Sequence, residues 1–405
     1  MTNKHTAIEI IKRLRANGHQ ALLAGGCVRD MLLGRPAKDY DVATSAHPQE
    51  VVKLFRRTLE IGAQFGVVMV MVDSEQVEVA TFRTESGYVD GRHPTNVSFS
   101  DPQHDASRRD FTVNGMFFDP IEEKVYDYVD GQADLKSKII RTIGNPNERF
   151  GEDYLRMLRG IRFSTQLDFT IAEDTWNAIC QNASKITDIS SERIAMEIEA
   201  IVTNPARVKG FSMLVESDLL AAIFPEYTIE KAGYAIKVLD HLPEYVDLPL
   251  ALAAVFADFT PDTAARQLDI LKLSNSHQKH ISYLLENTGL LLNDDMSLAD
   301  LKQTLACAYY QDLYDLQFAI QRAAGKPIEP LLKILARADQ LRDVDLSPKP
   351  LLNGHQLIEL GVTPGPMVGL VGKEMYIAQL DERLYDVDSA RQWVQNWLQN
   401  HRRLN

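Results

Sequence analysis

Two aspartates that follow a glycine turn are the residues of this 405-residue chain best suited to catalysis. Asp39 and Asp41 come after Gly25-Gly26, which follow the apolar run at 21–24. Glycines between a strand and a helix let backbone N–H groups approach a phosphate, and the positive end of the helix dipole favours the anion. If 39–43 is a strand, both carboxylates point the same way, roughly 7 Å apart. Such a pair beside a phosphate cradle meets the needs of phosphoryl transfer with two Mg²⁺ ions.

Each of these two patterns has an ordinary explanation when it is taken alone. Gly-Gly turns are common, and an Asp-x-Asp in a loop is usually a solvated turn. Their order, with Arg29 on a predicted helix at 28–33 between them, favours a catalytic site. Glu78 is a candidate third acid, because apolar residues flank it in a predicted strand at 76–82 that runs antiparallel to the aspartates. A surface glutamate on an edge strand explains Glu78 equally well.

Arginines gather in two further segments. The first is 108–114, where Arg109 and Asp110 combine donors with an acceptor, an arrangement suited to a triphosphate and to ribose hydroxyls. It follows residues 84–107, which have little apolar periodicity and are predicted to form a long loop. A loop of that length inside a compact domain is usually functional or disordered.

The second arginine segment, 147–163, is predicted to be helical and has charged residues at every third position of its second half. A carboxylate and a guanidinium one helical turn apart supply an acceptor and a fork of donors, which can read the edge of a nucleobase. On an isolated helix the same spacing would more often mean a solvated, salt-bridged face. The residues concerned are Asp153, Arg156, Arg159 and Arg162.

The composition is that of a globular protein in a reducing compartment. The formal net charge is −13, and the three cysteines are too few and too far apart for a disulfide framework or a cysteine zinc site. No apolar run approaches the ~20 residues that span a membrane, and the N-terminal segment does not resemble a signal peptide. We therefore expect a cytoplasmic protein. The acidic charge argues mildly against nucleic-acid binding, but residues 136–162 hold seven lysines and arginines and predict a basic groove.

The chain is predicted to change character near residue 143. Strand and helix patterns mix before that point, and the pattern from Pro146 to the end is helical, so the predicted fold class is α+β. Within 230–340, histidines that include His277 and His280 raise the question of a metal-dependent phosphohydrolase. The segment has no His-Asp doublet, and we expect no metal site there.

Five motifs in a fixed order resemble those of the class II tRNA nucleotidyltransferases, the family of the CCA-adding enzymes and their poly(A) polymerase relatives. The resemblance covers about residues 25–225, whereas the rest matches only in length and helical character. It implies a nucleotidyltransferase head related to DNA polymerase β at 1–143 and a helical neck that reads the nucleobase at 144–205. A helical body at 206–342 and a tRNA-binding helical tail at 343–405 complete the predicted organisation. The motifs are 25–41, 108–114, 130–135, 152–163 and 190–199.

The resemblance also implies a role for each candidate residue. Asp39 and Asp41 would hold the catalytic Mg²⁺, and Arg109 would contact the triphosphate. Asp110 would face the ribose or the metals, and the segment 84–107 would be a lever that switches the pocket from CTP to ATP. Nucleotide binding is implied for Gly26, Arg29, Arg109, Asp153, Arg156, Arg159 and Arg162, with Asp153 and Arg156 pairing with the incoming base.

The activity implied by the resemblance is addition of C, C and A to the tRNA 3′ end from CTP and ATP. No nucleic-acid template is used, and pyrophosphate is released. Three alternatives stay open: an A-adding enzyme that completes tRNA ending in CC, a poly(A) polymerase, and a non-catalytic RNA-binding protein. Residues 61–66 lack the Arg-Arg-Phe pattern that we associate with bacterial poly(A) polymerases. The sequence is compatible with a monomer or a homodimer.

Overall fold

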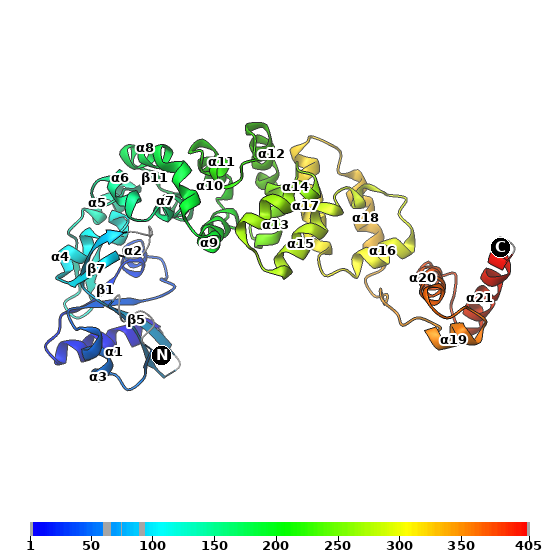
Figure 1. The fold of residues 1–405 in the computed structure, drawn as a ribbon, viewed down its shortest axis with the longest axis horizontal. Coiled ribbons are helices and arrows are strands. Elements are labelled where there is room, and N and C mark those ends of the chain that lie inside the picture. Colours follow the sequence, from blue (N-terminus) through cyan, green and yellow to red (C-terminus); the bar gives the residue numbers. More distant parts are fainter. Residues whose placement is uncertain (1–2, 60–65, 74, 89–93, 403–405) are drawn as a thin grey trace. The chain divides into compact units, whose positions relative to one another are not determined.

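The computed structural model describes residues 3–59, 66–73, 75–88 and 94–402. Internal contacts divide the chain into two compact units, one of residues 1–232 with 266–273 and one of residues 233–265 with 274–405. Figure 1 shows the main sheet in the blue and cyan N-terminal part and helices through the green-to-red remainder. The predicted α+β class is confirmed, and the division at 143, 205 and 342 stays a prediction.

Among the described residues, seven strands form one mixed sheet, in the order β3-β4-β5-β2-β1-β8-β9. Neighbouring strands are antiparallel except for β2 and β5, which run parallel with Val42 opposite Val79. The predicted antiparallel orientation of the Glu78 strand relative to the aspartates is therefore wrong. The parallel register matters, because Asp41 and Glu78 each directly precede a paired residue, which places them side by side on the two neighbouring strands. The strands are β1 (Ala21–Ala24), β2 (Asp41–Thr44), β3 (Thr58–Leu59), β4 (Val67–Val72), β5 (Glu75–Thr81), β8 (Phe117–Asp119) and β9 (Lys124–Tyr126).

Both faces of β1 are buried, which explains why this strand is apolar at every position. Helix α1 buries Ile10 and Leu14 in its apolar stripe and packs against β1 and β5. A cluster that includes Leu22, Phe82 and Phe117 fills the other side. The helices of this part are α1 (Asn3–Ala16), α2 (Gly26–Leu32), α3 (Pro48–Leu54), α4 (Pro102–Ser107) and α5 (Gly131–Ser137), with the 3₁₀ helix η2 (Thr112–Asn114).

The segment predicted as a long loop at 84–107 has regular structure instead. Strands β6 (Arg83–Tyr88) and β7 (Pro94–Phe99) form an antiparallel hairpin of their own, and α4 follows it. Residues 89–93 lie outside the described residues. The prediction relied on apolar periodicity, which a ladder of backbone hydrogen bonds between two strands does not require.

The rest of the first unit is helical, as predicted, except for one small parallel pair in which Ile139 of β10 lies opposite Thr170 of β11. The arginine segment is not one continuous helix, because α6 ends at Glu152 and α7 begins at Leu155. The elements are β10 (Ile139–Ile140), α6 (Pro146–Glu152), α7 (Leu155–Leu167), β11 (Thr170–Ile171), α8 (Glu173–Asn182), η3 (Ala183–Asp188), α9 (Ser191–Val202), α10 (Arg207–Glu216) and α11 (Leu219–Ile223).

Helix α13 is the centre of the second unit, because every one of its residues is buried. Towards the C-terminus a separate apolar cluster joins α19, α20 and α21 through residues such as Val371 and Trp397. None of the helices in the described ranges has both the length and the hydropathy that crossing a bilayer requires. The remaining elements are α12 (Ile229–Asp240), α13 (Leu248–Val255), α14 (Pro261–Leu268), η4 (Asp269–Leu271), α15 (Asn275–Glu286), η5 (Leu290–Leu292), α16 (Leu298–Leu305), α17 (Tyr310–Ala323), α18 (Glu329–Gln340), α19 (Gly354–Glu359), α20 (Pro366–Leu380) and α21 (Val387–Arg402).

Candidate active site

One cavity of about 740 Å³ in the first unit is lined by every residue that the sequence singled out for the site. These residues come from the β1–α2 turn, the start of β2, the loop after α4, the α6–α7 junction and α7. Folding therefore brings together side chains that lie more than 100 positions apart. The predicted residues in its lining are Gly26, Arg29, Asp39, Asp41, Arg109, Asp153, Arg156, Arg159 and Arg162.

The acidic wall of the cavity consists of Asp39, Asp41 and Glu78. Strand β2 begins at Asp41, so the predicted strand starts two residues too early, at Asp39. Both side chains nevertheless line the same cavity. Partial burial, followed by repulsion from Glu78, raises the pKa of Asp41 to about 6 although Arg109 opposes the shift. The side chain of Asp41 is open to the cavity, but enough protein surrounds it to weaken its hydration. This wall carries negative charge that the protein itself does not balance.

Backbone geometry requires a glycine at the first position of the turn. Gly25 has φ of +73°, a left-handed conformation that side chains disfavour, and a Cβ there would come 3.0 Å from Arg109 Nη1. Gly26 begins α2 and has no such strain. The turn therefore allows the chain to pass close to Arg109.

Arg29 and Arg109 are both held by hydrogen bonds before any ligand arrives. Arg29 donates to Asn114 Oδ1 at 2.8 Å and to Asp30, and Arg109 donates twice to Asp105. Asp105 is 1% exposed and also accepts from Arg108. Sequence reasoning missed Asp105 and Asn114, although the spacing of three and four residues between Asp105 of α4 and the two arginines that directly follow this helix was a usable signal.

Asp110 faces the arginine wall rather than the acidic one. Its Oδ2 lies 2.6 Å from Arg159 Nη2, and its Oδ1 accepts from the Phe111 N–H. Although burial opposes the shift, Arg159 lowers the pKa of Asp110 to about 2. After burial, the charge of Glu78 is the next largest cause of the raised pKa of Asp41, and Asp110 is not among the causes.

The helix break at the α6–α7 junction separates Asp153 from Arg156, which the sequence analysis had placed on one helical turn. Asp153 has an extended backbone and binds Arg193 of α9 through both oxygens, at 3.2 and 2.6 Å. Arg156 donates from Nη1 to Glu152 and to the Arg149 carbonyl. Arg193 lies in the predicted motif 190–199, but its partner could not be read from the sequence because the two residues are 40 positions apart.

Farther along α7, three guanidinium groups surround the ring of Phe163. Arg162 stands 4.5 Å from the ring centroid, and Arg29 and Arg159 each stand 5.4 Å from it. Arg162 is also paired with Glu197 of α9 at 2.9 Å. The cation–π contacts and the ion pairs together restrict where these guanidinium groups can point.

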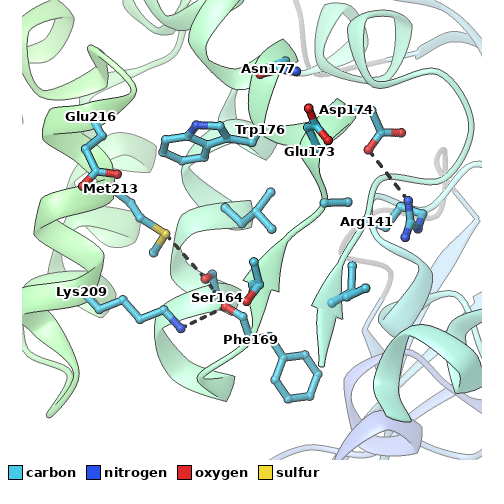
Figure 2. A pocket seen from close by; sticks show the side chains of 14 residues that line it. Arg141, Ser164, Phe169, Glu173, Asp174, Trp176, Asn177, Lys209, Met213 and Glu216 are labelled. Atoms are coloured by element: carbon cyan, nitrogen blue, oxygen red, sulfur yellow. Dashed lines mark hydrogen bonds and ion pairs between the residues drawn. The ribbon is translucent and has the colours of Figure 1, made fainter. Parts of the chain in front are cut away.

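A larger cavity, of about 980 Å³, lies beside β11 and is shown in Figure 2. It has an apolar lining that includes Trp176 and Met213, and no predicted site residue takes part in it. Lys209 at its edge donates to the Phe169 carbonyl and to Asp168. This cavity is the larger of the two, but the density of carboxylates and guanidinium groups identifies the smaller one as the candidate site.

Comparisons with known proteins identify the family of the chain. Residues 21–141 match the model of the poly A polymerase head domain, and residues 168–230 match that of a probable RNA- and SrmB-binding site of polymerase A. A CCA-adding enzyme of Lactobacillus johnsonii is 32% identical over 399 residues, 95% of each chain. One of Enterococcus faecalis is 35% identical over 377 residues, covering 90% of this chain and 88% of the other.

Solved structures agree as well. The crystal structure of the Bacillus stearothermophilus CCA-adding enzyme in complex with CTP superimposes with a TM-score of 0.84, at 27% identity and with complete coverage of both chains. Near-complete coverage at this level of identity extends through the helical parts that the motifs did not reach. The chain therefore belongs to the family of the CCA-adding enzymes and is a nucleotidyltransferase.

Proposed function

We propose that this chain adds C, C and A to the 3′ end of tRNA from CTP and ATP without a nucleic-acid template. The observation that carries the proposal is the single cavity in which an acidic wall faces a wall of arginines. The curated relatives are named for this activity, and the related Bacillus stearothermophilus structure holds CTP. Neither an A-adding enzyme nor a poly(A) polymerase is favoured by a specific feature of the cavity.

The acidic wall fits divalent metal, and we propose Mg²⁺ as the ion. Asp39, Asp41 and Glu78 offer only carboxylate oxygens, which are the ligands that Mg²⁺ prefers. Burial and crowding raise the pKa of Asp41, so a cation would relieve a repulsion that already exists. Asp39 and Asp41 would be the ligands, with Glu78 as the third acid. Bound ions would activate the tRNA 3′-hydroxyl and stabilise the pyrophosphate that leaves.

The arginines nearest the glycine turn are proposed to hold the triphosphate. Arg109 is anchored by Asp105, and Arg29 by Asn114, so both guanidinium groups are oriented in advance. Pre-ordered donors lose less conformational freedom on binding, which favours a fixed position of the reacting phosphate. Gly26, with no side chain, keeps the floor of the cavity open on the same side.

The α6–α7 junction is proposed to read the base. Asp153 is fixed by Arg193 and offers carboxylate oxygens, while Arg156 uses Nη1 for protein contacts and has two further nitrogens that carry hydrogens. Arg159 and Arg162 would support this pair and add positive charge near the phosphates. An acceptor and a donor fork that the protein holds in place can select a nucleobase without a nucleic-acid strand.

The remaining parts complete the proposal. We propose that the body at 206–342 and the tail at 343–405 bind the tRNA, while the head at 1–143 and the neck at 144–205 carry the reaction. The three cysteines are free thiols, which fits the proposed cytoplasmic location.

The deciding experiment is to incubate the purified chain with tRNA that ends before CCA, and separately with tRNA that ends in CC. Each substrate receives CTP alone, ATP alone or both, and the product 3′ ends are sequenced. We expect two C residues with CTP alone and complete CCA with both nucleotides. Addition of A to tRNA ending in CC without any C incorporation would assign the A-adding activity, and long A tracts would assign poly(A) synthesis.

A further inference from the structure

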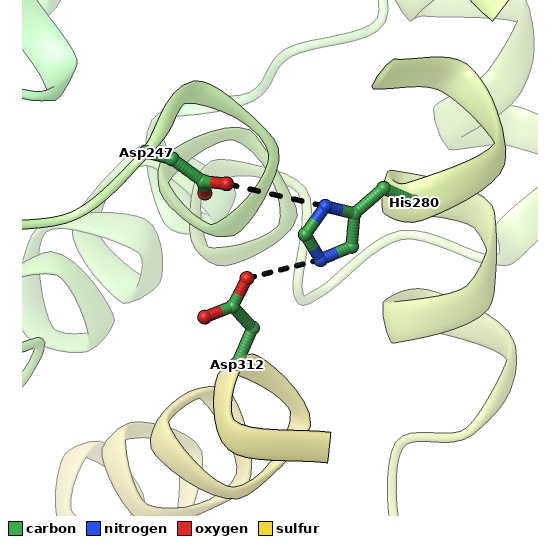
Figure 3. A group of neighbouring side chains, drawn as sticks. All are labelled: Asp247, His280 and Asp312. Atoms are coloured by element: carbon green, nitrogen blue, oxygen red, sulfur yellow. Dashed lines mark ion pairs between the residues drawn. The ribbon is translucent and has the colours of Figure 1, made fainter. Parts of the chain in front are cut away.

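Three side chains in the second unit form a compact group far along the chain from the cavity residues. Asp247 directly precedes α13, His280 is on α15 and Asp312 is on α17, and one ligating atom of each lies within 4.8 Å of the others. Figure 3 shows both carboxylates directed at the imidazole. Asp312 Oδ2 is 3.0 Å from His280 Nε2, and Asp247 Oδ2 is 4.0 Å from His280 Nδ1.

His280 is held rigidly, and one of its nitrogens lacks a hydrogen bond. The residue is 9% exposed, and its ring stacks on Tyr309 with centroids 3.9 Å apart and an interplanar angle of 16°. Its buried Nε2 has no hydrogen-bond partner among the described residues, although it faces the Asp312 carboxylate. A nitrogen lone pair turned towards a carboxylate oxygen is unfavourable unless a proton or a cation lies between them.

The two carboxylates are fixed by the helices that carry them. Asp247 Oδ1 accepts the Leu250 N–H at 3.0 Å and caps α13, which leaves Oδ2 for the group. The Asp312 side chain is partly buried, at 27% exposed, and faces the same imidazole as Asp247. Two acids are thus held near one histidine, so a positive ion between them would be stabilised.

We propose that Asp247, His280 and Asp312 bind one divalent transition-metal ion of the Zn²⁺ class and thereby link α13, α15 and α17. Zn–N and Zn–O bonds of about 2.0–2.2 Å allow two ligand atoms at the observed 3.0 Å separation to share an ion. Imidazole favours borderline ions such as Zn²⁺ or Co²⁺, whereas Mg²⁺ prefers oxygen alone. Three protein ligands leave at least one position for water.

A metal ion bound here would contradict the expectation that this helical region has no metal site. That expectation considered only a His-Asp doublet, whereas the three side chains are separated by more than 30 residues on either side of His280. They meet only because the three helices pack against one another. Zn²⁺ binding and heat stability can be measured whether or not the chain has the proposed activity.

The test is a Zn²⁺ titration of the full-length, metal-stripped chain against a chromophoric chelator, in a large excess of Mg²⁺ that keeps the acidic cavity wall occupied. We expect the wild type to bind one Zn²⁺. Each of the substitutions His280→Gln, Asp312→Asn and Asp247→Asn should weaken this binding by about tenfold or more. Asparagine caps a helix as well as aspartate does, so Asp247→Asn keeps the fold and removes only the ligand charge. His277→Gln on α15 and Asp315→Asn on α17 are matched controls that should leave the affinity unchanged.

Two further measurements sharpen the result. Zn²⁺ should raise the unfolding temperature of the wild-type chain and of both controls, but not that of the three ligand variants. Co²⁺ should produce visible absorption that disappears in His280→Gln, which reports imidazole ligation directly. Equal Zn²⁺ affinity in the wild type and all three ligand variants would overturn the proposal, and so would a Co²⁺ spectrum that persists without His280.

Discussion

The two walls of the cavity differ in whether their charged side chains form ion pairs within the protein. Each predicted arginine has a carboxylate partner within the protein: Arg29 with Asp30, Arg109 with Asp105, Arg156 with Glu152, Arg159 with Asp110 and Arg162 with Glu197. On the acidic wall, by contrast, Asp39, Asp41 and Glu78 form no ion pair within the described part of the chain. The cationic wall is balanced internally, and the acidic wall is not.

This difference shows how one cavity can receive two kinds of ligand. Arginines with partners are oriented in advance, so a triphosphate or a base meets donors already in place. Carboxylates without partners repel one another until a proton or a bound cation neutralises them, so their arrangement is coupled to metal binding. The arginine wall should therefore stabilise the fold with or without ligand, whereas the acidic wall should destabilise the metal-free fold at neutral pH and serve catalysis when a cation is bound.

The strongest way to test the difference is to remove an acid from the acidic wall. Asp41→Ala should lower nucleotide incorporation by about 10³-fold or more, because it removes a metal ligand. Binding of tRNA, measured by filter retention, should stay nearly intact. Asp30 pairs with Arg29 and does not line the cavity, so Asp30→Ala serves as the comparison and should cost far less activity. Survival of turnover in Asp41→Ala would show that the metal assignment is wrong.

Removing Arg156 should affect selection rather than chemistry. We expect Arg156→Ala to reduce the preference between CTP and ATP by about tenfold or more, because a guanidinium fork contributes about 1–3 kcal/mol to base discrimination. The ratio of kcat/KM values for the two nucleotides measures this effect. Arg141→Ala, at the edge of the other cavity, is the control. An unchanged ratio with a raised KM for both nucleotides would instead make Arg156 a phosphate contact.

Breaking a pair on the arginine wall should cost stability. Asp110 is buried and its pKa is held near 2 by Arg159 despite that burial, so Asp110→Asn should destabilise the fold by about 2 kcal/mol. Thermal unfolding of the metal-free chain would measure the loss. Asp168→Asn removes the partner of Lys209 on the surface and should leave the unfolding temperature nearly unchanged. Equal effects of the two variants would contradict the internal balance of this wall.

The smallest effect concerns pH. Because the pKa of Asp41 is about 6 in the folded chain and near 4 when unfolded, the folded state binds the proton more tightly. Its contribution to stability is complete below pH 4 and is lost as the pH rises through 6. Without metal, Asp41→Asn should therefore exceed the wild type in stability at pH 7.5, by about 1 kcal/mol after discounting for solvent. The difference between their unfolding temperatures should shrink towards pH 4.5, and a constant difference would contradict the shift.

Sequence reasoning succeeded where chemistry and order along the chain were sufficient. The apolar run at 21–24 became strand β1. It was less successful where pairing depended on distant residues. The parallel register of β2 with β5, the hairpin of β6 and β7 and the break at Asp153 each depend on backbone partners that local patterns do not specify.

The residue types and their order were enough to indicate the family of this chain and to propose most members of its candidate site, since those side chains must be present for the chemistry. Tertiary structure alone decided which charges are balanced. Asp153 pairs with Arg193, Asp110 pairs with Arg159, and His280 comes close to two aspartates only when the helices pack. The physical reason is that electrostatic partnership depends on distance and hydration in space, and neither quantity is encoded by proximity along the chain.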